Sequence, residues 1–461
     1  MSSSSLACRL ATPLAAAFLI SGCASVGIDA VLKDTNASTS SFTDGKLALT
    51  RTREQRMARL ALTDELLSRP ISENDAVQIA LANSPAVQAL LAQGWADIAA
   101  ANQQGRLPNP VFKFERLRLV DELELGRLLS VGLLDLILLP QRMALSKSQS
   151  EQVRVQLAST VIDQVTQVRQ AWVRAVAAQQ SLQYAVQVNE AAQASAELAR
   201  RMQEVGNFSK LQRARQQVFH ADATTQLASA QHGTAAARQE LVRLLGLDDV
   251  QAARLQLPER LPDLPRAPRD ASDLAQAANE QRLDVRLAKA QLDVAGKSQG
   301  LNLVSTFVNI EAGARHDTFF VNGARANRDG YELDIRLPLF DWGTSQRDAM
   351  NGQALAAAYR YDAAVRSATS QLREGYAAYR TAYDVARHYR DEVVPLRKTM
   401  AEENLLRYNG MLIGVFELLA DTREQIASVM AAINAQQQFW LADAALAASL
   451  AGRPTLPGNP S

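Results

Sequence analysis

Residues Tyr331–Gly343 have the sequence YELDIRLPLFDWG, in which nine residues alternate between apolar and polar side chains. In a strand, this alternation places one kind of side chain on each face. One face would carry Tyr331, Leu333, Ile335, Leu337 and Leu339, and the other Glu332, Asp334, Arg336 and Pro338. Elsewhere the chain consists largely of long Ala-, Gln-, Arg- and Leu-rich runs without Gly or Pro, which predict helices. The sequence therefore predicts an amphipathic strand in a mainly helical protein.

Composition limits the classes of function. The 461 residues include 49 basic and 48 acidic side chains, a net charge of +1, which does not suggest a nucleic-acid partner. The chain is 47% hydrophobic but only 5% aromatic, as expected of helices packed closely on helices. Its histidines show no metal-ligand spacing, and no nucleophile triad or phosphate loop is present. We therefore expect no enzyme activity, no cofactor and no metal site. The histidines are His220, His232, His316 and His388.

The N-terminus predicts export. Residues 1–22 combine one positive charge, the apolar run ATPLAAAFLI and the small residues Ser21-Gly22, as in a secretory signal peptide. Cys23 follows at once, which resembles a bacterial lipobox. Cys8 lies in the removed segment, so Cys23 is the only thiol left and has no intramolecular disulfide partner. We predict lipidation of Cys23 and an outer-membrane location; a plain signal peptide with a chance Cys is the alternative.

The chain is predicted to contain two repeats. Ala76–Ala80 and Ser84–Val87 match Leu274–Ala278 and Arg282–Val285, and the same shift brings Leu139-Pro140 onto Leu337-Pro338. Prolines in residues 251–270 forbid a continuous helix and mark a linker. The predicted order is a lipidated extension (23–71), a first repeat (72–250), the linker (251–270), a second repeat (271–452) and a tail (453–461).

Each repeat is predicted to run helix, strand, strand, long helix, Gly-bearing turn and return helix. The first helices are expected at 73–104 and 271–300, and the return helices at Lys210–Leu245 and Val415–Leu450. Residues 317–330, DTFFVNGARANRDG, are interpreted as a loop because of their Asn, Gly and Asp content. Pro395 is expected to kink or interrupt the second long helix. The strands are predicted at Val111–Leu119, Leu123–Leu139, 308–315 and Tyr331–Phe340.

Two apolar stripes on the long helices predict helix–helix seams. The first comprises Leu157, Val161, Val165, Val168 and Trp172; the second includes Leu372, Tyr376, Tyr379, Tyr383 and Ala386. Seam packing is favoured over a lumen lining for the three tyrosines.

Four strands alone cannot close a barrel and would leave two open edges. In lipid only helices and closed barrels satisfy the backbone. If three chains pooled their strands, the apolar face would meet lipid and Glu332, Asp334 and Arg336 would line a lumen. A strand in a soluble sandwich is the alternative.

The layout resembles the TolC-like outer-membrane efflux channel family over about Ser72–Gly452. The resemblance rests on the duplicated element order, on LPLFDWG at Leu337–Gly343, and on a Gly turn followed by Glu417-Leu418-Leu419. It implies a homotrimer with a twelve-stranded barrel in outer-membrane lipid and a helical periplasmic tunnel. It also implies docking to a periplasmic membrane-fusion adaptor and an inner-membrane pump.

The resemblance also implies roles for residues at the helical turns. Val205, Gly206 and Ser209 match the first docking tip, and Tyr408, Asn409 and Gly410 the second. Glu417 matches an acidic ring at the tunnel entrance, and Asp421 stands next to the family's second acidic position. The sequence departs from the family pattern at Asn207, at Met411, where the family has Gly, and at Ala420.

The resulting hypothesis is a passive duct for small molecules or metal ions. Two alternatives stay open: the duct of a type I protein secretion system, and a periplasmic structural coiled-coil lipoprotein. The second explains the helices and Cys23 but neither the strands nor the repeat.

Overall fold

The computed structural model describes residues 28–120, 122–270, 282–305, 309–321, 324–336 and 343–453. The chain divides into two compact units. Unit 1 contains the described residues of 1–35, 93–154 and 290–358, and unit 2 those of 36–92, 155–289 and 359–461. The β-sheet belongs to unit 1, whereas the helical turns at the predicted tips belong to unit 2.

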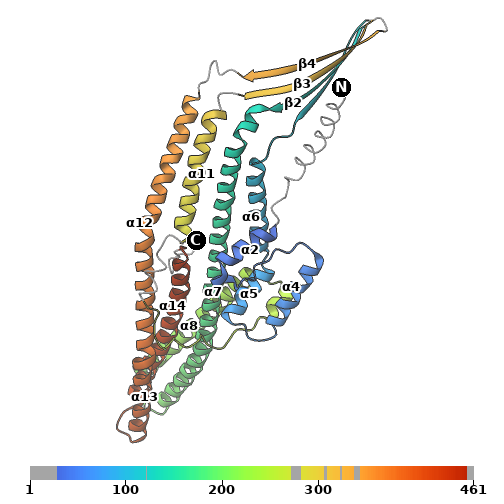
Figure 1. The fold of residues 1–461 in the computed structure, drawn as a ribbon. Helices are drawn as coiled ribbons and strands as arrows, with labels where there is room; N and C mark the ends of the chain where they lie inside the picture. Colours follow the sequence, from blue (N-terminus) through green and yellow to red (C-terminus); the bar gives the residue numbers. More distant parts are fainter. Residues whose placement is uncertain are drawn as a thin grey trace. The chain divides into compact units, whose positions relative to one another are not determined.

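The described elements are mainly helices, as predicted (Figure 1). In chain order they are α2 (Ile28–Ser38), α3 (Ser40–Thr43), α4 (Arg53–Leu66), α5 (Glu73–Asn83), α6 (Pro85–Gln104), β1 (Val111–Leu119), β2 (Glu122–Gly132), α7 (Leu133–Glu204), α8 (Lys210–Leu245), α9 (Asp249–Arg254), α11 (Leu283–Ser305), β3 (Asn309–Val321), β4 (Ala324–Arg336), α12 (Thr344–His388), the π-helix η1 (Tyr389–Val393), α13 (Val394–Asn409) and α14 (Val415–Leu450).

The four strands form one antiparallel sheet in the order β1-β2-β3-β4 (Figure 1). The predicted bounds of β1 are confirmed. β1 and β4 are the edge strands, and each leaves one row of backbone groups without a strand partner in this sheet.

The predicted strand Leu123–Leu139 is too long, because β2 ends at Gly132 and Leu133 begins α7. Apart from Asp135, residues 133–139 are all apolar, and such a run has no period that separates strand from helix. Asp135 lies in the first turn of α7, where a negative charge is favoured, and pairs with Arg142 at 2.6 Å. Pro140 lies inside α7, so the prediction that Leu139-Pro140 ends a strand is wrong.

The predicted loop at 317–330 is mostly strand, because β3 continues to Val321 and β4 begins at Ala324. Cross-strand ion pairs stabilise this extension: the Asp317 carboxylate lies 2.7 Å from the guanidinium of Arg328, its direct partner on β4. The dipeptide Asn322-Gly323 in the sequence is typical of a two-residue hairpin connection, and the prediction overlooked this signal.

The helical predictions hold better. α8 and α14 have the predicted bounds. α12 passes into the π-helical turn η1 immediately before α13, with Pro395 at the start of α13. Proline lacks an N–H and its ring clashes with the preceding turn, so the helix widens there. The expected helix at 73–104 is two helices, because Ser84, which precedes Pro85, is extended.

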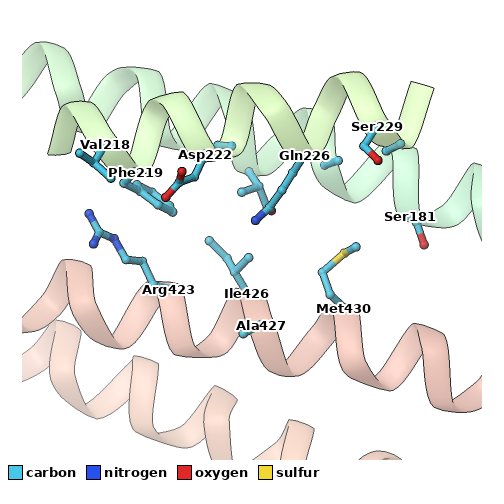
Figure 2. A pocket seen from close by; sticks show the side chains of 14 residues that line it. Ser181, Val218, Phe219, Asp222, Gln226, Ser229, Arg423, Ile426, Ala427 and Met430 are labelled. Atoms are coloured by element: carbon cyan, nitrogen blue, oxygen red, sulfur yellow. The ribbon is translucent and has the colours of Figure 1, made fainter. Parts of the chain in front are cut away.

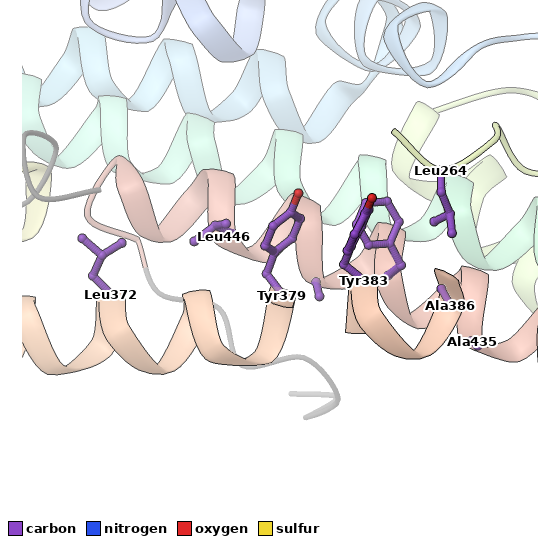
Figure 3. Close-up of a cluster of buried hydrophobic side chains, with 9 residues drawn as sticks. Leu264, Leu372, Tyr379, Tyr383, Ala386, Ala435 and Leu446 are labelled. Atoms are coloured by element: carbon purple, nitrogen blue, oxygen red, sulfur yellow. The ribbon is translucent and has the colours of Figure 1, made fainter. Parts of the chain in front are cut away.

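The predicted tyrosine seam is a buried core between α12, α14 and the linker (Figure 3). Tyr379 and Tyr383 are 1% and 0% exposed, and both rings contact Phe439, at centroid distances of 5.6 and 5.7 Å. The Tyr383 hydroxyl donates to carbonyl oxygens of the linker, at Pro265 (3.2 Å) and Arg266 (3.1 Å). Seam packing is therefore confirmed for Tyr379 and Tyr383.

The first predicted seam is buried along α7: Leu157, Val161, Val165, Val168 and Trp172 are at most 3% exposed. The Trp172 indole N–H donates to the carbonyl of Ile71 at 3.0 Å, which joins α7 to the end of the N-terminal extension.

The extension is anchored by side-chain amides. Asn36 bonds both the carbonyl and the N–H of Leu47, and Gln88 bonds the N–H of Thr50 and the carbonyl of Ala48. Predictions for Cys23, residues 271–281, Leu337–Trp342 and the tail from 454 lie outside the described residues.

Candidate functional site: sheet faces and helical tips

The strand register assigns every sheet residue to one of two faces, because directly opposed residues project to the same side. We call the face that carries Leu333 the apolar face. Its exposed residues include Tyr331 at 93%, Phe112 at 64% and Leu333 at 54%. Three successive rows form an apolar band: Phe112–Leu129–Ala314–Tyr331, then Val131–Ala312–Leu333, then Ile310–Ile335.

The opposite side, which we call the polar face, carries Glu332, Asp334 and Arg336. The register adds residues that the sequence analysis did not single out. The carboxylates on this face are Glu115, Glu122, Glu124, Glu311, Asp317, Glu332 and Asp334, and the cationic side chains are Lys113, Arg315, Arg328 and Arg336. Carboxylates are therefore in excess by three.

Asp317 is the centre of the polar face and is 1% exposed. Its carboxylate pairs with Arg315 at 3.0 Å and with Arg328 at 2.7 Å. Gly126 faces it on β2, and a Cβ at Gly126 would lie 3.3 Å from an Asp317 oxygen, so glycine makes room for the carboxylate.

The two arginines extend this network across the sheet. Arg315 reaches Glu332 on β4 at 3.4 Å and Glu115 on β1 at 3.7 Å, and Arg328 reaches Glu124 on β2 at 3.6 Å. All four strands are thus connected by one ionic network on the polar face.

The first helical tip is the turn between α7 and α8. Gly206 has a φ of +80°, and the N–H groups of Gly206 and Asn207 donate to the carbonyls of Gln203 (3.0 Å) and Met202 (2.8 Å). This is a Schellman motif, and it needs a left-handed residue at the position of Gly206. Ser209 accepts from the N–H of Gln212 and caps α8. Val205 is 69% exposed.

Charged residues precede this tip at the end of α7. The hydrogen bond from Arg200, with a second from Arg201, lowers the pKa of Glu197 to about 2. The Glu197 carboxylate therefore stays ionised throughout the physiological pH range.

The second tip, between α13 and α14, has the same hydrogen-bond pattern with a different residue at the left-handed position. The N–H groups of Met411 and Leu412 donate to the carbonyls of Tyr408 (2.9 Å) and Arg407 (2.8 Å). Met411 has a φ of +59°, whereas Gly410 has a φ of −79°. Met411 therefore takes the place of Gly206, and the glycine stands one residue too early.

Met411→Gly should stabilise the protein by about 1 kcal/mol, because a left-handed conformation strains an L-residue with a Cβ. The midpoint of thermal unfolding of the detergent-solubilised protein measures the change. Gly410→Ala is the matched control. Because Gly410 is not left-handed, its replacement by alanine should not lower the unfolding temperature. An unfolding temperature lowered by Met411→Gly would contradict the assigned turn.

The tips are joined in unit 2 through aromatic contacts. Phe208 packs on Phe416 with 4.5 Å between ring centroids. Further along, Arg423 of α14 lies 4.2 Å from the ring centroid of Phe219 on α8 and donates to Gln216 at 3.0 Å. Burial lowers the pKa of the Arg423 guanidinium. A cavity of about 690 Å³ adjoins Arg423 between α7, α8 and α14, lined by Val188, Phe219, Asp222, Gln226, Ile426 and Met430 (Figure 2).

Glu417 is the third residue of α14 and is exposed, in the first turn, where the helix dipole favours a carboxylate. Asp421 lies one turn further and is half-buried; its Oδ2 has no hydrogen-bond partner within the described residues. The two acidic residues lie on one side of the helix, as their spacing requires.

The described residues contain neither a candidate membrane-spanning helix nor a candidate metal site. No helix there combines the length and apolar content that crossing a membrane would need. No group of three or more His, Cys, Asp or Glu side chains within those ranges is placed to hold a metal ion.

Comparison with known proteins gives similarity of structure only. No protein-family model matches the sequence, and no curated protein matches it significantly. A membrane protein from Pseudomonas aeruginosa is 20% identical, with a TM-score of 0.67 over 85% of this chain and 93% of its own. The outer membrane protein VceC from Vibrio cholerae is 14% identical, with a TM-score of 0.68 over 82% and 96%.

The MtrE outer membrane channel of Neisseria gonorrhoeae, solved in its open state, is 18% identical, with a TM-score of 0.60 over 86% of this chain and 89% of its own. These matches extend over nearly the whole of both chains. The protein therefore has the fold of outer-membrane channels, which confirms at the level of the fold the resemblance seen in the sequence.

Proposed function

We propose that the protein is the outer-membrane channel of a tripartite efflux system: a passive duct through which an inner-membrane pump exports its substrate by way of a periplasmic adaptor. The observation that carries this proposal is the sheet, whose exposed apolar face lies opposite a charged face. The likeness in fold to outer-membrane channels supports it.

A homotrimer resolves the problem of the open sheet edges. A sheet in lipid must pair every backbone group, and β1 and β4 each have an open edge. Three copies supply twelve strands, and pairing β1 of one chain with β4 of the next closes the sheet into a barrel. The apolar band then faces lipid, and the polar face, with Glu332, Asp334 and Arg336, lines the lumen.

The charge of the polar face bears on the substrate. Three chains would place an excess of nine carboxylates around one lumen, since each polar face has an excess of three. Rings of carboxylates favour cations. Metal ions and cationic small molecules fit this field better than anions do.

The helical tips are the proposed docking surface for the adaptor, through Val205, Gly206 and Ser209 at the first turn and Tyr408, Asn409 and Gly410 at the second. Large apolar side chains are exposed there: Val205 at 69%, Met411 at 93% and Leu412 at 74%. Exposed apolar groups clustered at a turn suit a protein partner. Glu417 and Asp421 would form the acidic gate at the tunnel entrance.

Lipid on Cys23 would add an anchor to the barrel, while the helices form the periplasmic tunnel. The test is the oligomeric mass of protein extracted by detergent from the outer-membrane fraction, for the wild type and Cys23→Ala. We expect both to be membrane-integrated trimers. If Cys23→Ala becomes a soluble monomer or dimer, the chain is instead a lipid-tethered coiled coil.

A further inference from the structure

Basic side chains gather on the apolar face beyond the apolar band, toward the two hairpin ends of the sheet. The next three rows of this face are Phe114–Arg127–His316–Asp329, Arg116–Leu125–Thr318–Asn327 and Arg118–Leu123–Phe320–Arg325. They contain four arginines and one aspartate, apart from the histidine. On the polar face, the three rows at the same end of the sheet contain four carboxylates and one arginine: Glu115, Glu122, Glu124, Asp317 and Arg328. The outer end of the sheet thus has opposite charge on its two faces.

Within the described residues, three of these arginines have no protein anion to neutralise them. Arg116, Arg118 and Arg325 are exposed, and none makes an ion pair within the described residues. By contrast, the single aspartate of these rows is engaged by His316, and Arg127 donates to the Thr318 hydroxyl at 3.4 Å.

The three free arginines lie on the two edge strands. Arg116 and Arg118 are on β1, Arg325 is the second residue of β4, and both strands have their hairpin ends at this end of the sheet. Closure of the proposed barrel would bring β1 of one subunit against β4 of the next, and with them their arginines. Like charges brought together at such a seam repel one another, so a bound anion would stabilise each seam.

The residues next to these arginines indicate which kind of anion would bind. In the outermost row of each sheet, Leu123 and Phe320 on the inner strands adjoin Arg118 and Arg325 on the edge strands, so an apolar residue flanks each seam on either side. A free phosphate would gain nothing from this apolar surface. An amphiphile would place its acyl chains on the leucine and phenylalanine and its anionic headgroup on the guanidinium groups, which hydrogen-bond phosphate oxygens in pairs.

We propose that Arg116, Arg118 and Arg325 bind the phosphate groups of lipid A, the glycolipid of the outer leaflet, at the seams between subunits. This rests on the proposed function, because it requires the closed barrel in the outer membrane. The phosphate groups of lipid A would thereby contact arginines of two neighbouring subunits, while its acyl chains cover the apolar face.

The test compares the detergent-solubilised trimer with and without added bis-phosphorylated lipid A. Lipid A should raise the temperature at which the wild-type trimer dissociates. Each cationic side chain near an anionic lipid surface contributes about 1 kcal/mol to binding. The triple variant Arg116→Gln/Arg118→Gln/Arg325→Gln should therefore bind lipid A on the order of 100-fold more weakly than the wild type does. Dephosphorylated lipid A should not stabilise the wild type.

The matched control removes three exposed arginines from helices of unit 2, as Arg53→Gln/Arg56→Gln/Arg366→Gln, and should bind lipid A like the wild type. Unchanged affinity in the sheet variant, or an equal loss in the control, overturns the inference. Equal stabilisation by phosphatidylglycerol overturns lipid A as the ligand. If the wild type is a membrane-integrated trimer whose dissociation temperature does not change with lipid A, this inference alone is wrong. If the wild type is not a trimer, the proposed function is wrong as well.

Discussion

Leu333→Arg should abolish the proposed membrane-integrated trimer. Leu333 is in the middle of the three apolar rows and is 54% exposed on the apolar face. In a barrel this face meets lipid, where an arginine near the bilayer midplane costs about 2–4 kcal/mol in each chain. A homotrimer carries the substitution three times, so the total cost of about 6–12 kcal/mol is comparable to the whole stability of a typical folded protein, about 5–15 kcal/mol. The measurement is the fraction of protein that resists carbonate extraction from membranes as a trimer.

The adjacent residue provides the control. Asp334→Arg introduces the same side chain one position along β4, but on the polar face, where Glu311 is its direct cross-strand partner. Arginine there meets water and a carboxylate, so this variant should insert and assemble like the wild type. If both variants assemble equally well, the apolar face does not meet lipid and the barrel is wrong. If both fail, the strand tolerates no arginine, and the two faces are not distinguished.

Much of the sheet was predictable from local alternation, and the errors have physical causes. β1 has the predicted bounds, and Leu333 and Glu332 lie on opposite faces. The extension of β3 and β4 was missed because Asp317 and Arg328 are typical loop and surface residues when read singly, and only their pairing across two strands makes them strand residues. Pairing across a hairpin leaves no local period in the sequence, and the local signal that was present, the turn dipeptide Asn322-Gly323, was overlooked.

The helical part shows the same limit at different positions. The return helices were predictable from the glycines that precede them and from uninterrupted helix-forming residues. The start of α7 was missed because an apolar run fits a strand and a helix equally well. At the second tip, a change in the sequence did not change the structure. Met411 stands where the resembled family has glycine, yet Met411 adopts the left-handed conformation that the turn needs.

Phe439→Ala should destabilise unit 2 by about 3–5 kcal/mol, the cost of removing a buried aromatic ring and leaving a cavity. Phe439 is 0% exposed and contacts three rings: Tyr379, Tyr383 and Trp440. Aromatic pairs add stabilisation beyond buried area, and all three would be lost. The measurement is the guanidinium midpoint in detergent at fixed protein concentration, because assembly couples stability to concentration.

Tyr359→Ala controls for the loss of an aromatic residue as such. Tyr359 is on α12 and is 65% exposed, so its truncation should change the free energy of unfolding by no more than about 0.5 kcal/mol. A loss below about 1 kcal/mol for Phe439→Ala would contradict the seam, since such a small value indicates a ring that water already reaches. The tyrosines would then be free to face the tunnel, and a lumen lining would replace packing as their role.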